Sequence, residues 1–115
     1  MKLSGEGKLL RIFLGEADRY DGQQLFEAIV HLARSRGLAG ATVLRGVEGF
    51  GAHSRIHKST ILELSEDLPI LIEVVDTSDK IEALIPEIDA MIEKANCGAM
   101  MTIEKVDVRK YAAGK

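Results

Sequence analysis

The fold of this chain follows from one stretch of its sequence, PILIEVVDTSDKIEALIPEIDAMIEKANCGAMMTIEKVDV, residues 69–108. Residues 69–75 alternate as in a strand. Leu71 and Val75 would lie on one face, and Ile70, Ile72 and Val74 on the other. Pro69 has no N–H to donate, so it belongs at the start or the edge of that strand. Residues 100–108 alternate apolar and charged positions and predict another strand.

A helix is predicted between these two strands. Its apolar residues follow i, i+3, i+4, i+7 spacing: Ile81, Leu84, Ile85, Ile88, Met91, Ile92 and Ala95. Pro86 falls inside this pattern, so it either bends the helix or lies in its first turns. Asn96-Cys97-Gly98 ends the helix.

The N-terminal part of the chain repeats this order. Residues 8–16 alternate like a strand, with Leu10, Ile12 and Leu14 on one face. Asp21 offers an N-cap, supported by Gln24 three residues later, for a helix that reaches Arg36 and stops at Gly37. The apolar stripe of this helix consists of Leu25, Phe26, Ile29, Leu32 and Ala33.

The middle of the chain supplies further extended segments. Ala41, Val43 and Val47 mark a strand, and residues 60–64 read as extended before a turn at 65–67. The order is therefore βαββαβ, which predicts a single α+β domain over residues 1–115. Its fold would be ferredoxin-like, with an antiparallel sheet and both helices on one face. The other sheet face keeps apolar residues, so we expect a second subunit to cover it.

Composition limits the classes of function. The chain has 115 residues, 46% hydrophobic and 29% charged, with a net charge of −3, which is ordinary for one soluble domain and argues against nucleic-acid binding by bulk electrostatics. No run approaches membrane-spanning length, and charges interrupt the N-terminus too often for a signal peptide. The single cysteine, Cys97, fits a reducing compartment, so we expect a cytoplasmic protein that is not membrane-embedded.

The segment RGVEGFGAHSRIHK, residues 45–58, stands apart from this scaffold. It has no periodicity that would bury it, so we expect a long, exposed loop that carries the function. Glycines permit close approach of a ligand, and basic side chains attract anions. The candidate ligand-binding residues in it are Gly46, Gly49, Phe50, Gly51, Arg55 and Lys58.

Two features carry a resemblance to a known family. Gly49-Phe50-Gly51 is similar to the G-F-G at the base of the long T-loop of PII signalling proteins, and Leu68-Pro69 with residues 70–75 is similar to their L-P-x-V-x-I-E-I-V-V strand. The chain resembles the PII proteins and, more closely, a PII-like family sometimes encoded beside fluoride channels.

The resemblance implies a homotrimer that binds a small effector, usually an adenine nucleotide, in clefts between subunits. It implies that the T-loop contacts a protein target, for instance a membrane transporter. Arg109 and Lys110 lie where PII proteins place phosphate-contacting residues. One departure is the connection at residues 96–99, which has no lysine where PII proteins have a Gly-rich, Lys-containing phosphate loop, so a smaller or differently placed anion stays an alternative.

The candidate residues of this segment also allow roles without an anion. The glycines would equally suit a bulge and a turn, and Phe50 would either stack on a base or anchor the loop to a neighbouring subunit. His53 and His57 are weak candidates for metal ligands, as in the related divalent-cation tolerance proteins. No catalytic pair or triad is recognisable, which favours a binding module over an enzyme.

Overall fold

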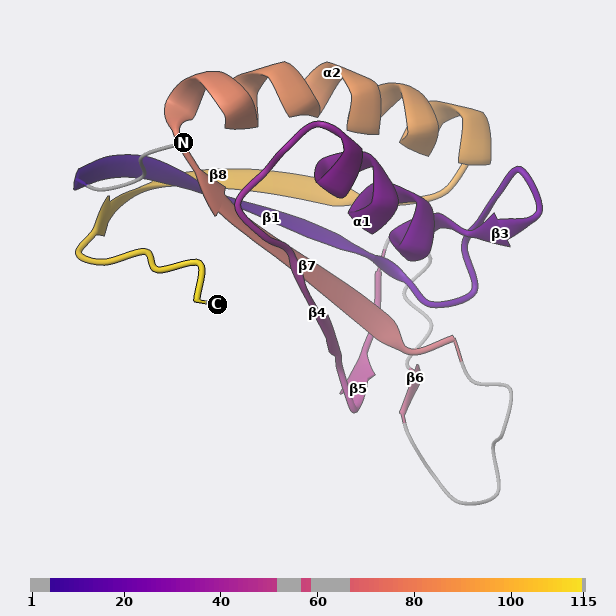
Figure 1. Cartoon of the computed structure of the whole chain (residues 1–115). Coiled ribbons are helices and arrows are strands. Elements are labelled where there is room, and N and C mark those ends of the chain that lie inside the picture. Colours follow the sequence, from indigo (N-terminus) through magenta and orange to yellow (C-terminus); the bar gives the residue numbers. More distant parts are fainter. Residues whose placement is uncertain (1–4, 52–56, 59–66, 115) are drawn as a thin grey trace.

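The computed structural model describes residues 5–51, 57–58 and 67–114, and it has two layers. Two helices cover one face of a four-stranded antiparallel sheet (Figure 1). The sheet order is β4-β7-β1-β8, formed by Thr42–Arg45, Pro69–Asp76, Gly5–Gly15 and Met100–Val108, and the helices are α1, Leu25–Ser35, and α2, Ser78–Ala95. The predicted α+β, ferredoxin-like arrangement is confirmed.

Two small hairpins extend beyond this sheet. Strands β2, Arg19–Tyr20, and β3, Gln23–Gln24, pair with each other before α1. Strands β5, Glu48–Gly49, and β6, His57–Lys58, pair with each other below the sheet (Figure 1). The extended segment predicted at residues 60–64 lies outside the described residues.

Strand β1 is central, and its register fixes the two ends of the sheet. At one end Gly15 lies opposite Pro69, which is the first residue of β7 as predicted. At the other end Gly5 lies opposite Val108 of β8. These two ends are therefore about 34 Å apart, at roughly 3.4 Å per residue along β1.

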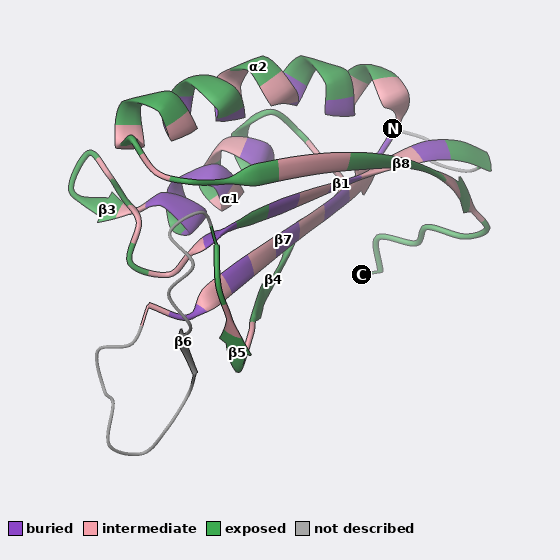
Figure 2. Cartoon of the chain, turned by 180° about the vertical axis from the view of Figure 1, so that it is seen from behind, coloured by how far each residue is buried: buried purple, intermediate pink, exposed green. Residues whose placement is uncertain are grey.

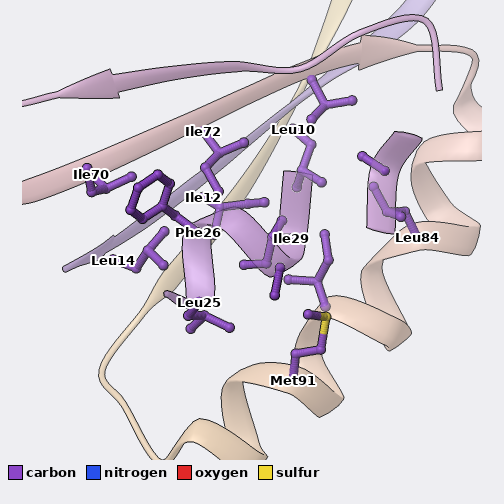
Figure 3. Close-up of a cluster of buried hydrophobic side chains, with 14 of the residues drawn as sticks. Leu10, Ile12, Leu14, Leu25, Phe26, Ile29, Ile70, Ile72, Leu84 and Met91 are labelled. Atoms are coloured by element: carbon purple, nitrogen blue, oxygen red, sulfur yellow. The ribbon is translucent and has the colours of Figure 1, made fainter. Parts of the chain in front are cut away.

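The core lies between the sheet and the helices. The exposed fraction of β7 alternates strictly from residue to residue, and Figure 2 shows this alternation along the strand. The even-numbered residues of β1 and β7 point toward α1 and α2, where they meet the apolar stripes of both helices (Figure 3). The central side chains are Leu10, Ile12, Ile72, Leu25, Ile29, Ile81, Leu84 and Ile88, and burial of each contributes about 1.5–3 kcal/mol.

The first helix begins later than the sequence suggests. Asp21 was predicted as its N-cap, but the structure places Asp21 in the β2–β3 turn with φ +47°, and Gln24 occupies the N-cap. The predicted stop at Gly37 is confirmed, because Gly37 has φ +75°. The amides of Gly37 and Leu38 donate to the carbonyls of Arg34 and Ala33, which completes a Schellman motif.

The second helix runs without a break past Pro86, which lies in its middle rather than in its first turns. Pro86 is exposed, so its missing N–H falls on the solvent side of α2. Asn96 ends the helix in the left-handed conformation, with φ +53° and ψ +47°.

A fully buried carboxylate, Asp76, holds the far end of the sheet together. Its oxygens accept hydrogen bonds from the amides of Ala39, at 2.8 Å, and Thr77, at 2.6 Å. These bonds tie the segment before β4 to the start of α2. Sequence reasoning ended the strand at Val75 and missed this residue.

The sheet face away from the helices, which we call the open face, carries a row of apolar side chains across all four strands. The register places Leu44 opposite Leu71, Leu71 opposite Phe13, and Phe13 opposite Met100. Phe13, Leu44 and Met100 are 40%, 47% and 61% exposed. Beside this row, Arg11 forms ion pairs with Glu73, at 2.9 Å, and with Glu104.

Candidate functional site

The predicted loop at residues 45–58 begins where β4 ends at Arg45, and it is partly ordered into strands. Glu48 lies opposite Lys58 and Gly49 opposite His57 in the β5–β6 ladder. The expectation of a loop without secondary structure is therefore wrong for these positions, because their backbone groups satisfy each other across the ladder. Residues 52–56, which include His53 and Arg55, lie outside the described residues, as do the side chains of His57 and Lys58.

Two of the candidate glycines pack against Pro69. A Cβ added at Gly46 would lie 2.7 Å from Cγ of the Pro69 ring, and one added at Gly49 would lie 3.0 Å from the same atom. The amide of Gly46 also donates to the carbonyl of Pro69 at 2.7 Å. Close packing on the proline therefore explains both glycines without a ligand.

Val47, Phe50 and Gly51 of this segment face solvent. Val47 and Phe50 are 75% and 69% exposed, which is high for a valine and a phenylalanine. A Cβ added at Gly51 would have no atom within 4 Å, and the Gly51 φ is not positive. Among the described candidate residues of this segment, Phe50 and Gly51 are thus free to meet a ligand or a partner.

The turn at residues 15–18 contacts the end of β4 and the residues just before β7. Glu16 forms an ion pair with Arg45, just before Gly46. The amide of Glu16 donates to the carbonyl of Leu68 at 2.9 Å, and the amide of Ala17 donates to Oδ1 of Asp67 at 2.7 Å. Sequence reasoning missed this junction because it joins residues about 50 positions apart.

The same turn lies near the connection between α2 and β8. The Asp18 carboxylate accepts the amide of Gly15 at 2.8 Å, and its negative charge lies close enough to Cys97 to affect the thiol. Burial, together with the neighbouring negative charge of Asp18, raises the pKa of Cys97 to about 11. Burial likewise raises the pKa of Asp18. The negative charge of Asp67 raises it further, whereas the hydrogen bond from the Gly15 amide lowers it.

This chemistry differs from that of a phosphate cradle. The connection at residues 96–99 contains no lysine or arginine, and the nearby Asp18 is acidic. A thiol whose pKa is raised stays protonated at neutral pH, so Cys97 is a poor nucleophile. The local electrostatics therefore disfavour a phosphate at this connection.

Two of the basic candidates, Arg109 and Lys110, lie at the opposite end of the sheet. Arg109 and Lys110 follow β8, whose last residue, Val108, pairs with Gly5 at one end of the sheet. Phe50 comes after β4 in the chain, and β4 ends at the other end of the sheet, near Gly15. Both basic side chains are exposed, and Arg109 lies 3.8 Å from Asp107. Among the described candidates, one chain alone does not bring Phe50 together with Arg109 and Lys110.

A shallow groove of about 540 Å³ lies elsewhere, between α1 and α2. Leu32, Met91 and His31 are among its lining residues. A bidentate ion pair crosses it, with Nε of Arg36 2.8 Å from Oε2 of Glu87. The Arg36 guanidinium lowers the pKa of Glu87 by this hydrogen bond.

Within residues 5–51, 57–58 and 67–114, no three His, Cys, Asp or Glu side chains are grouped so as to hold a metal ion. His53 and the side chain of His57 are not covered by this statement, so the metal site remains a prediction. Over the same described ranges, neither helix combines the length and hydropathy that a membrane crossing needs.

Solved structures with this fold include PII-like proteins. CPII from Thiomonas intermedia, a nitrogen regulatory PII-like protein bound to ADP, AMP and bicarbonate, superposes with a TM-score of 0.69 at 18% identity, covering 91% of this chain and 90% of that one. A putative PII-like signalling protein from Thermus thermophilus gives 0.66 at 16% identity, covering 95% and 94%. The divalent ion tolerance protein CutA1 from Ehrlichia chaffeensis gives 0.56 at 12% identity, covering 97% and 89%.

Comparison of the amino-acid sequence identifies relatives and a family in addition to the shared fold. A UPF0166 protein from Aquifex aeolicus is 35% identical over 101 residues, which cover 88% of this chain and 91% of the relative. A second, from Methanocaldococcus jannaschii, is 32% identical over 88 residues, covering 76% and 81%. The DUF190 family profile, described as "Uncharacterized ACR", matches residues 7–108. The chain belongs to the DUF190 family.

Proposed function

We propose that this protein is a PII-like regulatory protein that binds a small anionic effector between two copies of the chain. The observation that carries the proposal is the separation of its candidate residues. The exposed Phe50 and the exposed Arg109 and Lys110 lie toward opposite ends of the sheet. A neighbouring copy is the simplest means of bringing the two halves of such a site together.

The open face supplies the surface for that association. Its row of Leu44, Leu71, Phe13 and Met100 exposes apolar area that a subunit interface would bury. A closed homo-oligomer, for which we propose a trimer, covers this face on every copy. The number of effector sites between subunits then equals the number of chains.

The effector that fits these residues is small, anionic and partly aromatic. Arg109 and Lys110 attract negative charge, whereas the acidic surroundings of residues 96–99 do not. The Phe50 ring is available to stack on a base. An adenine nucleotide combines both properties, and the ADP and AMP bound to the Thiomonas protein support this choice.

In this proposal the protein regulates a target and catalyses no reaction. Effector binding changes what the segment around Val47 and Phe50 presents, and these exposed apolar side chains offer a contact for a target protein. A membrane transporter as this target remains a prediction that rests on the family resemblance.

Isothermal titration calorimetry of the purified protein tests the binding step. ATP, ADP, AMP and bicarbonate are titrated separately, and we expect saturable heat with at least one adenine nucleotide at millimolar concentration or below. Absence of heat with all four would reject the proposal. Cu²⁺ and Zn²⁺ titrated against the wild type and against His57→Ala test the metal alternative, which requires the variant to lose binding.

A further inference from the structure

We propose that Tyr111 is a positioning residue of the effector site, because it holds the C-terminal tail, residues 109–114, against the connection between α1 and β4. The inference rests on the proposed function, since Arg109 and Lys110 lie on this tail and form the basic half of the proposed site. It adds a residue that acts through these two cations and not by a charge of its own.

The tail needs an anchor, because regular secondary structure ends before it. Strand β8 ends at Val108, and residues 109–114 belong to no helix or strand. Arg109 and Lys110 are exposed, and the ion pair of Arg109 with Asp107 joins two exposed side chains that are two residues apart. Such a pair is screened by water and contributes little order. The position of both cations therefore depends on what holds the tail further along.

Tyr111 provides a contact with a distant part of the chain. Its hydroxyl donates to the carbonyl of Ala39 at 3.3 Å, across 72 positions of sequence, and the residue is 45% exposed. Figure 1 shows the tail folding back below the end of β8, on the side away from α2, and the reverse view in Figure 2 agrees. Because β8 and β4 are the two outer strands of the sheet, the tail that leaves one outer strand is bonded to the connection that enters the other.

The connection that receives Tyr111 is itself firmly held. The amide of Ala39 donates to Oδ2 of Asp76 at 2.8 Å, and Asp76 is fully buried. Nζ of Lys80, in the first turn of α2, donates to the carbonyl of Gly37 at 2.7 Å. Ala39 thus uses its amide on a buried carboxylate and offers its carbonyl to the tail. The bond from Tyr111 therefore ties the tail to the core of the domain.

This arrangement lowers the cost of binding an anion. A free tail would have to lose conformational freedom when Arg109 and Lys110 engage an effector, and this loss weakens binding. A tail already held at Tyr111 has lost part of that freedom on folding. Two cations on adjacent residues are then kept near the Gly5 end of the sheet, where β8 ends. The hydroxyl of Tyr111 should therefore increase the affinity for an anionic effector without touching it.

NMR relaxation of the ligand-free protein tests whether Tyr111 holds the tail. Tyr111→Phe keeps the ring and removes the donor, so we expect the backbone order parameters of residues 109–113 to fall from about 0.8 to below about 0.6. Tyr20→Phe is the matched control, because Tyr20 lies in the β2–β3 hairpin with its ring 5.4 Å from Nζ of Lys94, away from the tail. Tail order parameters that are equal in the wild type and in Tyr111→Phe would overturn the inference.

Calorimetry with ADP tests the positioning role. We expect Tyr111→Phe to raise the Kd about three- to tenfold, as for one lost hydrogen bond, and Tyr20→Phe to leave it unchanged. In an Arg109→Ala background the same substitution should change the Kd less, because part of what Tyr111 positions is gone. An equal change in both backgrounds would overturn the positioning role. A wild type that binds no ADP, together with loss of tail order in Tyr111→Phe, would support the anchoring and reject the nucleotide as effector.

Discussion

Gly46 and Pro69 are in contact through both backbone and side chain. The amide of Gly46 donates to the Pro69 carbonyl at 2.7 Å, while the proline ring occupies the space that a Cβ on residue 46 would need. The contact fixes where the chain leaves β4. It also converts a sequence feature that suggested a ligand into a packing requirement.

Substitution of Gly46 should therefore destabilise the fold. Gly46→Ala places a methyl group 2.7 Å from the ring, and we expect a loss of about 1–3 kcal/mol in the free energy of unfolding, measured with urea. Gly51→Ala is the matched control, because its Cβ meets no atom within 4 Å, and it should change stability by less than about 0.5 kcal/mol. Equal losses for both variants would contradict the packing role of Gly46.

The Cys97 thiol should titrate far above neutrality. Its reaction rate with iodoacetamide should follow a pKa of about 11 in the folded protein, and a lower pKa, near 8.5, in the urea-unfolded chain. Because folding raises the pKa, the thiol supports folding fully at lower pH, and this contribution is lost as the pH rises to about 11.

Asp18 contributes to that shift through its charge and its hydrogen bond, after burial. Asp18→Asn should accordingly lower the thiol pKa without restoring the unfolded value, whereas Asp21→Asn should leave it unchanged. An unchanged titration of Cys97 in Asp18→Asn would show that the contact is absent in solution.

The open face should mediate self-association. Phe13→Lys places a charge in the apolar row beside Leu71 and Met100, so native mass spectrometry should show the assembly shifting to monomers. Ala90→Lys carries the same charge at an exposed position on α2 and should leave the assembly intact. Circular dichroism confirms that both variants are folded, and an intact Phe13→Lys assembly would exclude this interface.

A site built from two copies allows complementation between defective chains. Phe50→Ala and Arg109→Ala should each weaken ADP binding by about 1–3 kcal/mol, because one loses stacking and the other a charged hydrogen bond. Refolding the two variants together should restore part of the high-affinity sites, measured by calorimetry. A chain carrying both substitutions, refolded with either single variant, is the control that restores none.

Failure of the mixed sample, with subunit mixing verified by native mass spectrometry, would place both residues in a site within one chain or in no site. The outcome separates the two-copy arrangement from the identity of the effector, since any nucleotide that binds the wild type can replace ADP in the assay.

The sequence predicted the scaffold well because the scaffold depends on periodicity. Alternation in β1 and β7 and the helical spacing from Ile81 onward each follow from one buried face, and the structure confirms them. The start of α1 was predicted wrongly because an Asp-Gly turn between β2 and β3 resembles an N-cap in sequence.

The candidate site was predictable only in part, since its geometry depends on contacts distant in sequence. Gly46 and Gly49 were predicted to contact a ligand because they lie in a Gly-rich segment. The proline that requires them lies about 20 residues away. The Asp18–Cys97 contact and the Asp67–Ala17 bond carry no local pattern at all. Periodicity reports burial, and it does not report which polar groups meet across a turn.

The packing of two glycines on one proline also has an evolutionary consequence. The ring of Pro69 fills the space left by two missing side chains, so positions 46, 49 and 69 form one steric unit. A larger residue at 46 becomes tolerable only when 69 is reduced, and a smaller residue at 69 leaves a gap that only growth at 46 or 49 can fill. Across the family these three positions should change together or not at all, because together they set the direction in which the chain leaves β4.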